Sequence, residues 1–234
     1  MSYQPNVVTR TQADIDQGLR SHMLRVYNYM AAALGLTGLI AYFVGTNPAM
    51  MTTLIKNPVL FWVIALAPIA LVFFLSFRIA HMSFATAQLT FWIFAALMGL
   101  SLASIFVVYT QESIARVFFI TAGTFAAMSI YGYTTKRDLT NMGSFLMMGL
   151  IGIIIASVVN IFLKSSGLGF AISILGVLIF VGLTAYDTQK IKEMYMESDD
   201  STISGKKAIM GALALYLDFI NLFLMLLRLF GDRK

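Results

Sequence analysis

The stretch GALALYLDFINLFLMLLR, residues 211–228, is an apolar run long enough to cross a membrane, yet it carries Asp218 in its interior. A second apolar run ends in GLTAYDTQK, residues 182–190, and carries Asp187. An ionised carboxylate in hydrocarbon costs about 2.5–3.5 kcal/mol even on the mildest insertion scale, so each needs a partner, a water-filled cavity or a proton. We therefore predict that the two aspartates lie within hydrogen-bonding reach, directly or through one water.

The rest of the chain has the composition of a membrane protein with many spans. Of its 234 residues, 59% are hydrophobic and only 12% are charged, and the mean hydropathy is +0.82. An ordinary globular domain is about 45–50% apolar and about 25% charged. Because about 20 apolar helical residues cross a bilayer, we predict an all-α integral membrane protein with seven transmembrane helices. The predicted spans are residues 26–45, 59–77, 88–109, 115–133, 143–163, 168–187 and 208–230.

Short connections between these runs leave room for a single transmembrane bundle. We predict a cytoplasmic N-terminal tail at residues 1–23, the bundle at residues 24–231 and a C-terminal tail at residues 232–234. The N-terminal tail has no apolar core of the kind that a cleaved signal peptide needs. Most of the sixteen Lys and Arg residues fall on the side of the N-terminus. This bias predicts a cytoplasmic N-terminus and an outside C-terminus.

Several function classes are excluded by the composition. The chain contains no cysteine, so disulfides, thiolate chemistry and Cys-ligated zinc are not available. Its net charge of +5 comes from Lys and Arg at the ends of the apolar runs, with no basic stripe of interleaved aromatic residues. Nucleic acid is therefore not an expected partner, and the lipid bilayer is.

The last apolar run carries its small and polar residues on one stripe. They follow one another at steps of three and four, which places them on one face of a helix. These residues are Gly211, Ala214, Asp218, Asn221, Met225 and Arg228. A helix with such a stripe and an otherwise apolar surface is suited to a central position in the bundle.

Pairs of small residues at helix-contact spacing predict close packing of other helices. These pairs are Gly35 and Gly38, Gly123 and Ala127, Gly152 and Ala156, and Ala208 and Ala212.

Other polar side chains are expected around the two aspartates. Thr184 lies one turn before Asp187, and its hydroxyl group can donate a hydrogen bond to the same cluster. The remaining supporting residues are Asn221, Tyr186, Tyr216 and Arg78. Arg78 ends the second apolar run, where its charge either reaches the membrane surface or forms a salt bridge with the aspartates.

Two carboxyl groups in contact share a proton, and their titration belongs to the pair. The pair can therefore act as a proton-sensitive latch. The alternative is a structural role, in which hydroxyl groups, Asn221 or backbone amides satisfy each carboxyl group and hold two helices together. Calcium takes 6–8 oxygen ligands, so Asp187 and Asp218 with Thr184, Asn221 and backbone carbonyls predict only weak calcium binding. No other metal or cofactor is expected.

Four segments together resemble a known family. They are GLSLASIFVVYT (residues 99–110), YGYTTKRDLT (131–140), AYDTQKIK (185–192) and LYLDFINLFLMLLRLFG (215–231). The chain resembles the transmembrane BAX inhibitor motif family, in its bacterial inner-membrane branch, over residues 24–231. The resemblance implies six helices around a central seventh, a di-aspartyl sensor at Asp187 and Asp218, and a pH-sensitive calcium leak. It also implies an arginine latch on one aspartate, for which Arg78 is the candidate, and a link of bacterial relatives to a membrane-anchored AAA protease.

We therefore expect a calcium or cation leak channel gated by the aspartate pair. The alternative is a regulatory membrane protein that modulates a membrane-anchored AAA protease or a stress response without transport. In that case the N-terminal tail would be the segment that contacts the partner. An intramembrane aspartyl protease is a third reading, because such enzymes also pair aspartates on two helices. Those enzymes carry Gly-x-Gly-Asp where this chain has Leu215-Tyr216-Leu217-Asp218, and the chain lacks their Pro-Ala-Leu element. We expect no enzymatic activity.

Overall fold

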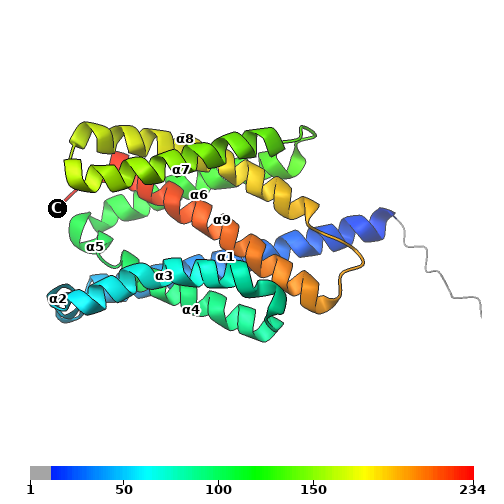
Figure 1. Cartoon of the computed structure of the whole chain (residues 1–234), viewed down its shortest axis with the longest axis horizontal. Helices are drawn as coiled ribbons and strands as arrows, with labels where there is room; N and C mark the ends of the chain where they lie inside the picture. Colours follow the sequence, from blue (N-terminus) through cyan, green and yellow to red (C-terminus); the bar gives the residue numbers. More distant parts are fainter. Residues whose placement is uncertain (1–11) are drawn as a thin grey trace, which may run out of the picture.

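The structure, a computed structural model, describes the backbone of residues 12–234 and the side chains of residues 17–234 (Figure 1). Apart from one isolated bridge between Tyr109 and Arg233, all regular secondary structure in the described chain is helical. The elements are α1 (Gln12–Gly45), α2 (Pro48–Lys56), α3 (Pro58–Arg78), the 3-10 helix η1 (Ile79–His81), α4 (Phe84–Leu102), α5 (Ile105–Val108), α6 (Gln111–Thr134), α7 (Thr140–Leu163), α8 (Ser166–Glu193) and α9 (Ser201–Phe230).

Seven helical segments of the described chain are long and apolar enough to span a membrane, which confirms the predicted number. They are Gln17–Gly45, Pro58–His81, Phe84–Val108, Gln111–Thr134, Thr140–Leu163, Ser166–Glu193 and Ser201–Phe230. The first helix begins at Gln12, inside the segment predicted as an N-terminal tail, and Met23 is buried. Residues 1–11 of that predicted tail lie outside the described residues.

Side-chain caps set most of the helix boundaries. Asn57, Ser83 and Thr110 each precede a helix and accept a hydrogen bond from a backbone N–H of its first turn. Asn47 does the same for α2, with Pro48 as the first helical residue, where the missing N–H has no cost. The connection between the first two predicted spans is therefore mostly helical, because the Asn-Pro step that ends α1 also starts α2.

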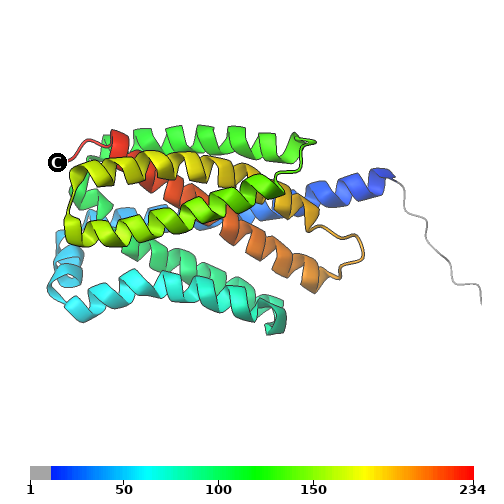
Figure 2. The ribbon, with the colours of Figure 1, turned by 45° about the horizontal axis from the view of Figure 1, so that its top comes forward.

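The helix α9 occupies the centre of the bundle. In its most apolar window 72% of the residues are buried, against at most 39% in any other spanning helix of the described chain. It runs obliquely past its neighbours and packs most extensively against α8, then against α1, α6 and α4 (Figures 1 and 2). The start of α1 and the α8–α9 loop lie at one end of the bundle, called here the N-terminal end, and the end of α9 lies at the opposite, C-terminal end.

The stripe predicted on α9 divides in two. Gly211, Asp218 and Met225 are buried, whereas Ala214 and Asn221 are partly exposed. With Leu217 and Leu224, these two form a second stripe along which α9 is less completely covered. The centre of the bundle is therefore not closed on every side of α9.

Close helix approach occurs at glycines other than those predicted. A Cβ on Gly35, Gly38, Gly123 or Gly152 would contact nothing within 4 Å, so the prediction of close packing at these positions was wrong. On Gly132 a Cβ would overlap the backbone carbonyl of Ala185, which marks the contact of α6 with α8. Spacing along one helix does not show which face meets a neighbour. Ala208 and Ala212 are fully buried in α9, as predicted.

Candidate functional site

Asp187 and Asp218 come together where α8 and α9 pack against each other. Asp187 lies near the C-terminal end of α8, and Asp218 lies past the middle of α9, which returns through the bundle after the loop at residues 194–200. Asp218 is only 4% exposed, and Asp187 is half-buried. The carboxyl groups of the two residues lie within hydrogen-bonding reach of each other.

A hydrogen bond between two carboxyl groups has a direct chemical implication. An ionised carboxylate has acceptors only, so one member of the pair must carry the proton that forms the bond. Oδ2 of Asp218 is buried and accepts no hydrogen bond from an N–H or hydroxyl group of any described residue. Unpartnered buried oxygens are uncommon in folded proteins and call for a reason. The arrangement can therefore hold a proton, and it keeps one carboxyl oxygen free of protein donors.

The hydroxyl and amide groups expected beside the pair are bonded within their own helices. Thr184 donates its hydroxyl hydrogen to the carbonyl of Phe180, at 2.7 Å, and Asn221 donates from its amide to the carbonyl of Leu217, at 2.8 Å. Such bonds to the preceding turn are common for these residue types in helices. Neither group donates to the aspartates in this structure.

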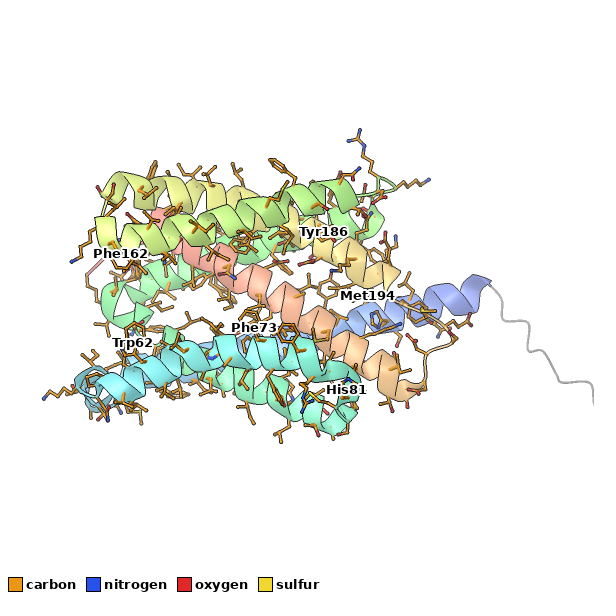
Figure 3. The ribbon with its side chains drawn as sticks, viewed as in Figure 1. Trp62, Phe73, His81, Phe162, Tyr186 and Met194 are labelled. Carbon is orange, nitrogen blue, oxygen red and sulfur yellow. The ribbon has the colours of Figure 1, made fainter. Side chains whose placement is uncertain are left out.

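Tyr186 and Tyr216 both point away from the pair. The ring of Tyr186 packs over Gly143 of α7, and Lys190 lies 5.8 Å from the centre of that ring (Figure 3). The hydroxyl group of Tyr216 lies 2.7 Å from that of Thr37 on α1. Residues two apart on a helix do not share a face, which explains why Tyr216 and Asp218 contact different neighbours.

Arg78 also lies apart from the aspartates. It is the last residue of α3 and is exposed, and it forms no ion pair with any residue whose side chain the structure describes. The structure therefore does not bring the candidate latch to the pair.

Three polar contacts next to Asp187 were not predicted. The hydroxyl groups of Thr188 on α8 and Ser129 on α6 lie 3.2 Å apart, and both residues are buried. Gln189 accepts from the backbone N–H of Leu139 and donates to the carbonyl of Arg137, each at 2.8 Å, which ties α8 to the α6–α7 turn. In the sequence, the spacing of four residues between Thr184 and Thr188 was the signal that could have indicated polar contacts on this face of α8.

The loop between the two aspartate-bearing helices is also held in place. Lys207 pairs with Asp199 at 2.5 Å, and Asp200 accepts from the backbone N–H of Ile203 as the N-cap of α9. The ring of Tyr195 lies 5.8 Å from that of His22 on α1. These contacts fix the entry of α9 at the N-terminal end.

The two carboxyl groups do not form a complete metal centre. Within the described side chains, no group of three or more His, Cys, Asp or Glu residues lies close enough together to hold a metal ion. Calcium takes 6–8 oxygen ligands, so an ion at this pair would need further oxygens from backbone carbonyls or water. The two carboxyl groups alone supply too few oxygens for tight calcium binding.

Comparisons with known proteins agree over almost the whole chain. The family described as "Inhibitor of apoptosis-promoting Bax1" matches residues 19–234. The inner membrane protein YbhL of Escherichia coli is 50% identical over 93% of this chain and 94% of its own length. An uncharacterized protein of Rickettsia prowazekii is also 50% identical, over 97% of this chain and 95% of its own. An uncharacterized membrane protein of Streptococcus pyogenes is 36% identical over 96% of this chain and 97% of its own.

Proposed function

The chain belongs to the family described as inhibitor of apoptosis-promoting Bax1, and we propose that it is a cation leak channel, for calcium foremost, gated by Asp187 and Asp218. The close approach of these two carboxyl groups, within hydrogen-bonding reach inside a bundle of membrane-spanning helices, is the observation that carries the proposal.

The shared proton has a mechanical role in this proposal. While the pair holds a proton, its hydrogen bond joins α8 to α9 close to the centre of the bundle. When both groups are ionised, the bond is lost and the like charges repel each other. A divalent cation stabilises the ionised pair and competes with the proton for the same oxygens. We therefore propose that flux is low while the pair is protonated and rises with pH.

The burial of α9 supports access to the pair from one direction. Asp218 is buried, but Leu217 and Asn221, its neighbours on the less covered stripe, are partly exposed. A small change in the packing of α8 against α9 joins Asp218 to that stripe. The carboxylates, the carbonyl of Leu217 and the amide oxygen of Asn221 then offer a short series of weak oxygen sites. Such sites favour passage of a cation over its tight binding.

We propose the inner membrane as the location, as for YbhL, with the N-terminal end of the bundle in the cytoplasm. Lys190, Lys192, Lys206 and Lys207 lie at that end, in agreement with the bias of cytoplasmic segments toward Lys and Arg. Asp187 lies near the same end, so the pair would respond mainly to cytoplasmic pH. The proposal gives the pair no catalytic role.

The test uses purified protein in liposomes that contain a calcium indicator. Wild-type flux is compared at a mildly acidic and a mildly alkaline pH with the flux of Asp187→Asn and Asp218→Asn. Asparagine keeps the volume and much of the hydrogen bonding but does not titrate. We expect wild-type flux to rise with pH and the flux of each Asn variant to be independent of pH. Tyr216→Phe, which changes α9 on a different face, should retain the pH dependence of the wild type.

Two results would count against this function. Wild-type flux equal to that of empty liposomes at both pH values removes the channel. If the pH dependence of flux survives in both Asn variants, the pair is not the pH sensor and the aspartates have a structural role. The first result would favour the alternative, in which the protein regulates a membrane-anchored AAA protease or another membrane partner without transport.

A further inference from the structure

A polar cavity of about 450 Å³ lies at the C-terminal end of the bundle, away from the aspartate pair. It is formed where α7 ends, α8 begins and α9 ends. Three basic residues from three different segments line it, namely Lys164, Arg228 and Arg233. Neither the aspartate pair nor the proposed leak makes use of this cavity.

The three positive charges have no acidic partner among the described side chains. Asp232, next to Arg233 in the chain, instead pairs with Arg116 at 2.8 Å. Three cations around one cavity repel one another, and a bound anion relieves this repulsion. Arginine is suited to phosphate because its planar group donates two parallel hydrogen bonds.

The cavity also offers neutral hydrogen-bond donors. The amide oxygen of Asn160 accepts from the backbone N–H of Ser165, at 3.0 Å, while its amide nitrogen makes no hydrogen bond to the described protein. Ser166, the first residue of α8, contributes to the lining. Backbone N–H groups at the start of a helix favour negative charge, which adds to the effect of the three cations.

The backbone of Lys164 is the second unusual feature of this cavity. It is the only non-glycine residue of the described chain with a positive φ, 50°, and it ends α7 in the left-handed conformation. Glycine is the usual residue at such a position, because a side chain there costs about 1–2 kcal/mol. The turn itself would be more stable with glycine, so the lysine places a charge at the cavity at some cost in stability.

The position of the cavity indicates where its ligand comes from. Membrane-spanning segments end at Leu163 and Phe230 and begin at Ser166, which sets the cavity at the depth of the lipid headgroups. Phe170, which lines the cavity, is 60% exposed and in position to contact acyl chains. A phosphate that belongs to a lipid would bring its own acyl chains to this ring.

We propose that this cavity binds the phosphodiester headgroup of an anionic phospholipid, through Lys164, Arg228 and Arg233, with an acyl chain against Phe170. Basic pockets between membrane helices are suited to such headgroups. The site is independent of the proposed leak.

Lipid retention measured by native mass spectrometry tests this proposal. The full chain is extracted from membranes that contain phosphatidylcholine and phosphatidylglycerol, and the bound lipids are counted. We expect phosphatidylglycerol to be retained in preference. Arg228→Gln and Arg233→Gln should each weaken this preference about fivefold, since one basic residue near an anionic headgroup contributes about 1 kcal/mol. Lys56→Gln is the matched control, because α2 lies at the same end of the bundle but outside the cavity (Figure 1).

Lys164→Gly separates binding from folding. It removes one charge and relieves the left-handed strain, so it should lower phosphatidylglycerol retention without lowering the melting temperature in phosphatidylcholine. Equal retention of the two lipids by the wild type would overturn the proposal, as would an equal loss with Lys56→Gln. If inorganic phosphate at matched ionic strength stabilises the protein in phosphatidylcholine as much as phosphatidylglycerol does, the site takes free phosphate and the lipid assignment is wrong.

Discussion

The hydroxyl group of Tyr216 lies 2.7 Å from that of Thr37, and Thr37 in turn lies 2.8 Å from the carbonyl of Ala95. Because the single hydroxyl hydrogen of Thr37 goes to this carbonyl, Tyr216 must be the donor to Thr37. The three residues belong to α9, α1 and α4, and all are buried. These two hydrogen bonds connect the central helix α9 to α1 and α4, on the opposite side of α9 from α8.

Tyr216→Phe should lower the free energy of unfolding by about 1 kcal/mol, because one buried hydrogen bond is lost while Thr37 keeps its bond to Ala95. The ring contact of Tyr216 with Phe94, at 5.2 Å between centroids, is retained in the variant. Thermal unfolding in a neutral detergent measures the change. If Tyr216→Phe lowered the free energy of unfolding as much as removal of a whole aromatic side chain does, the hydroxyl group would have another role.

At the aspartate pair, the size of the stability loss should depend on what replaces the carboxyl group. Asp187→Asn preserves a hydrogen bond to Asp218 and should change the free energy of unfolding by less than about 1 kcal/mol. Asp187→Ala leaves the buried carboxyl group of Asp218 without its partner and should cost about 1–3 kcal/mol. Melting temperatures of the two variants measure this order. Equal losses would mean that Asp218 does not depend on Asp187.

Gly132 and Gly123, both on α6, should respond in opposite directions to alanine. A Cβ at position 132 meets the backbone of Ala185, which cannot rotate away, so Gly132→Ala should destabilise the protein by about 1–3 kcal/mol. At position 123 a Cβ meets nothing within 4 Å, and Gly123→Ala should stabilise the helix by about 0.5–1 kcal/mol. Thermal unfolding of the matched pair measures both effects. Similar values for the two variants would contradict the close contact of α6 with α8.

Asp138, in the turn between α6 and α7, should contribute to stability in a pH-dependent way. The side-chain hydroxyl of Thr140 and its backbone N–H, the latter at 2.8 Å, donate to this carboxylate and hold its pKa below the ordinary value. A carboxyl group with a depressed folded-state pKa stabilises the fold above its unfolded-state pKa, and this contribution is lost as the pH falls through the folded-state pKa.

We therefore expect Asp138→Asn to lower the melting temperature slightly at neutral pH. The difference from wild type should shrink as the pH falls from about 3.9, the ordinary Asp value, through the lower folded-state pKa. Calorimetric scans across this range test the prediction. A difference that stays constant in acid would assign the effect of the substitution to something other than titration.

Much of the architecture could be predicted because it depends on composition along single helices. The seven apolar runs and the mixed stripe on the last of them indicated a bundle with a central helix, and the cost of burying Asp187 and Asp218 in hydrocarbon indicated that they would meet. Their roles as sensor and ion site stay predictions. The short helix α2 was missed because Asn and Pro serve equally well in a loop and at the start of a helix.

The surroundings of the pair could not be predicted in the same way. Thr184 and Asn221 each have a carbonyl available one turn earlier on their own helix, and this local bond competes with any bond across helices. Tyr216 was assigned by its nearness to Asp218 in sequence, but two residues along a helix correspond to a turn of about 200°, toward a different neighbour. Contacts such as that of Ser129 with Thr188 depend on how separate helices meet, which a single sequence does not record.

The central position of α9 also bears on how the protein is made. All six surrounding spans precede α9 in the chain, so a ribosome completes them before the helix around which they pack exists. Until α9 is inserted, the faces that will bury Tyr216 and Asp218 have no helix to cover them, and Asp187 has no partner for its carboxyl group. The six earlier spans can already pack in part on one another, as α1 does on α4 and α8 on α6 and α7, but the buried faces that meet α9 are completed only when the last helix is inserted.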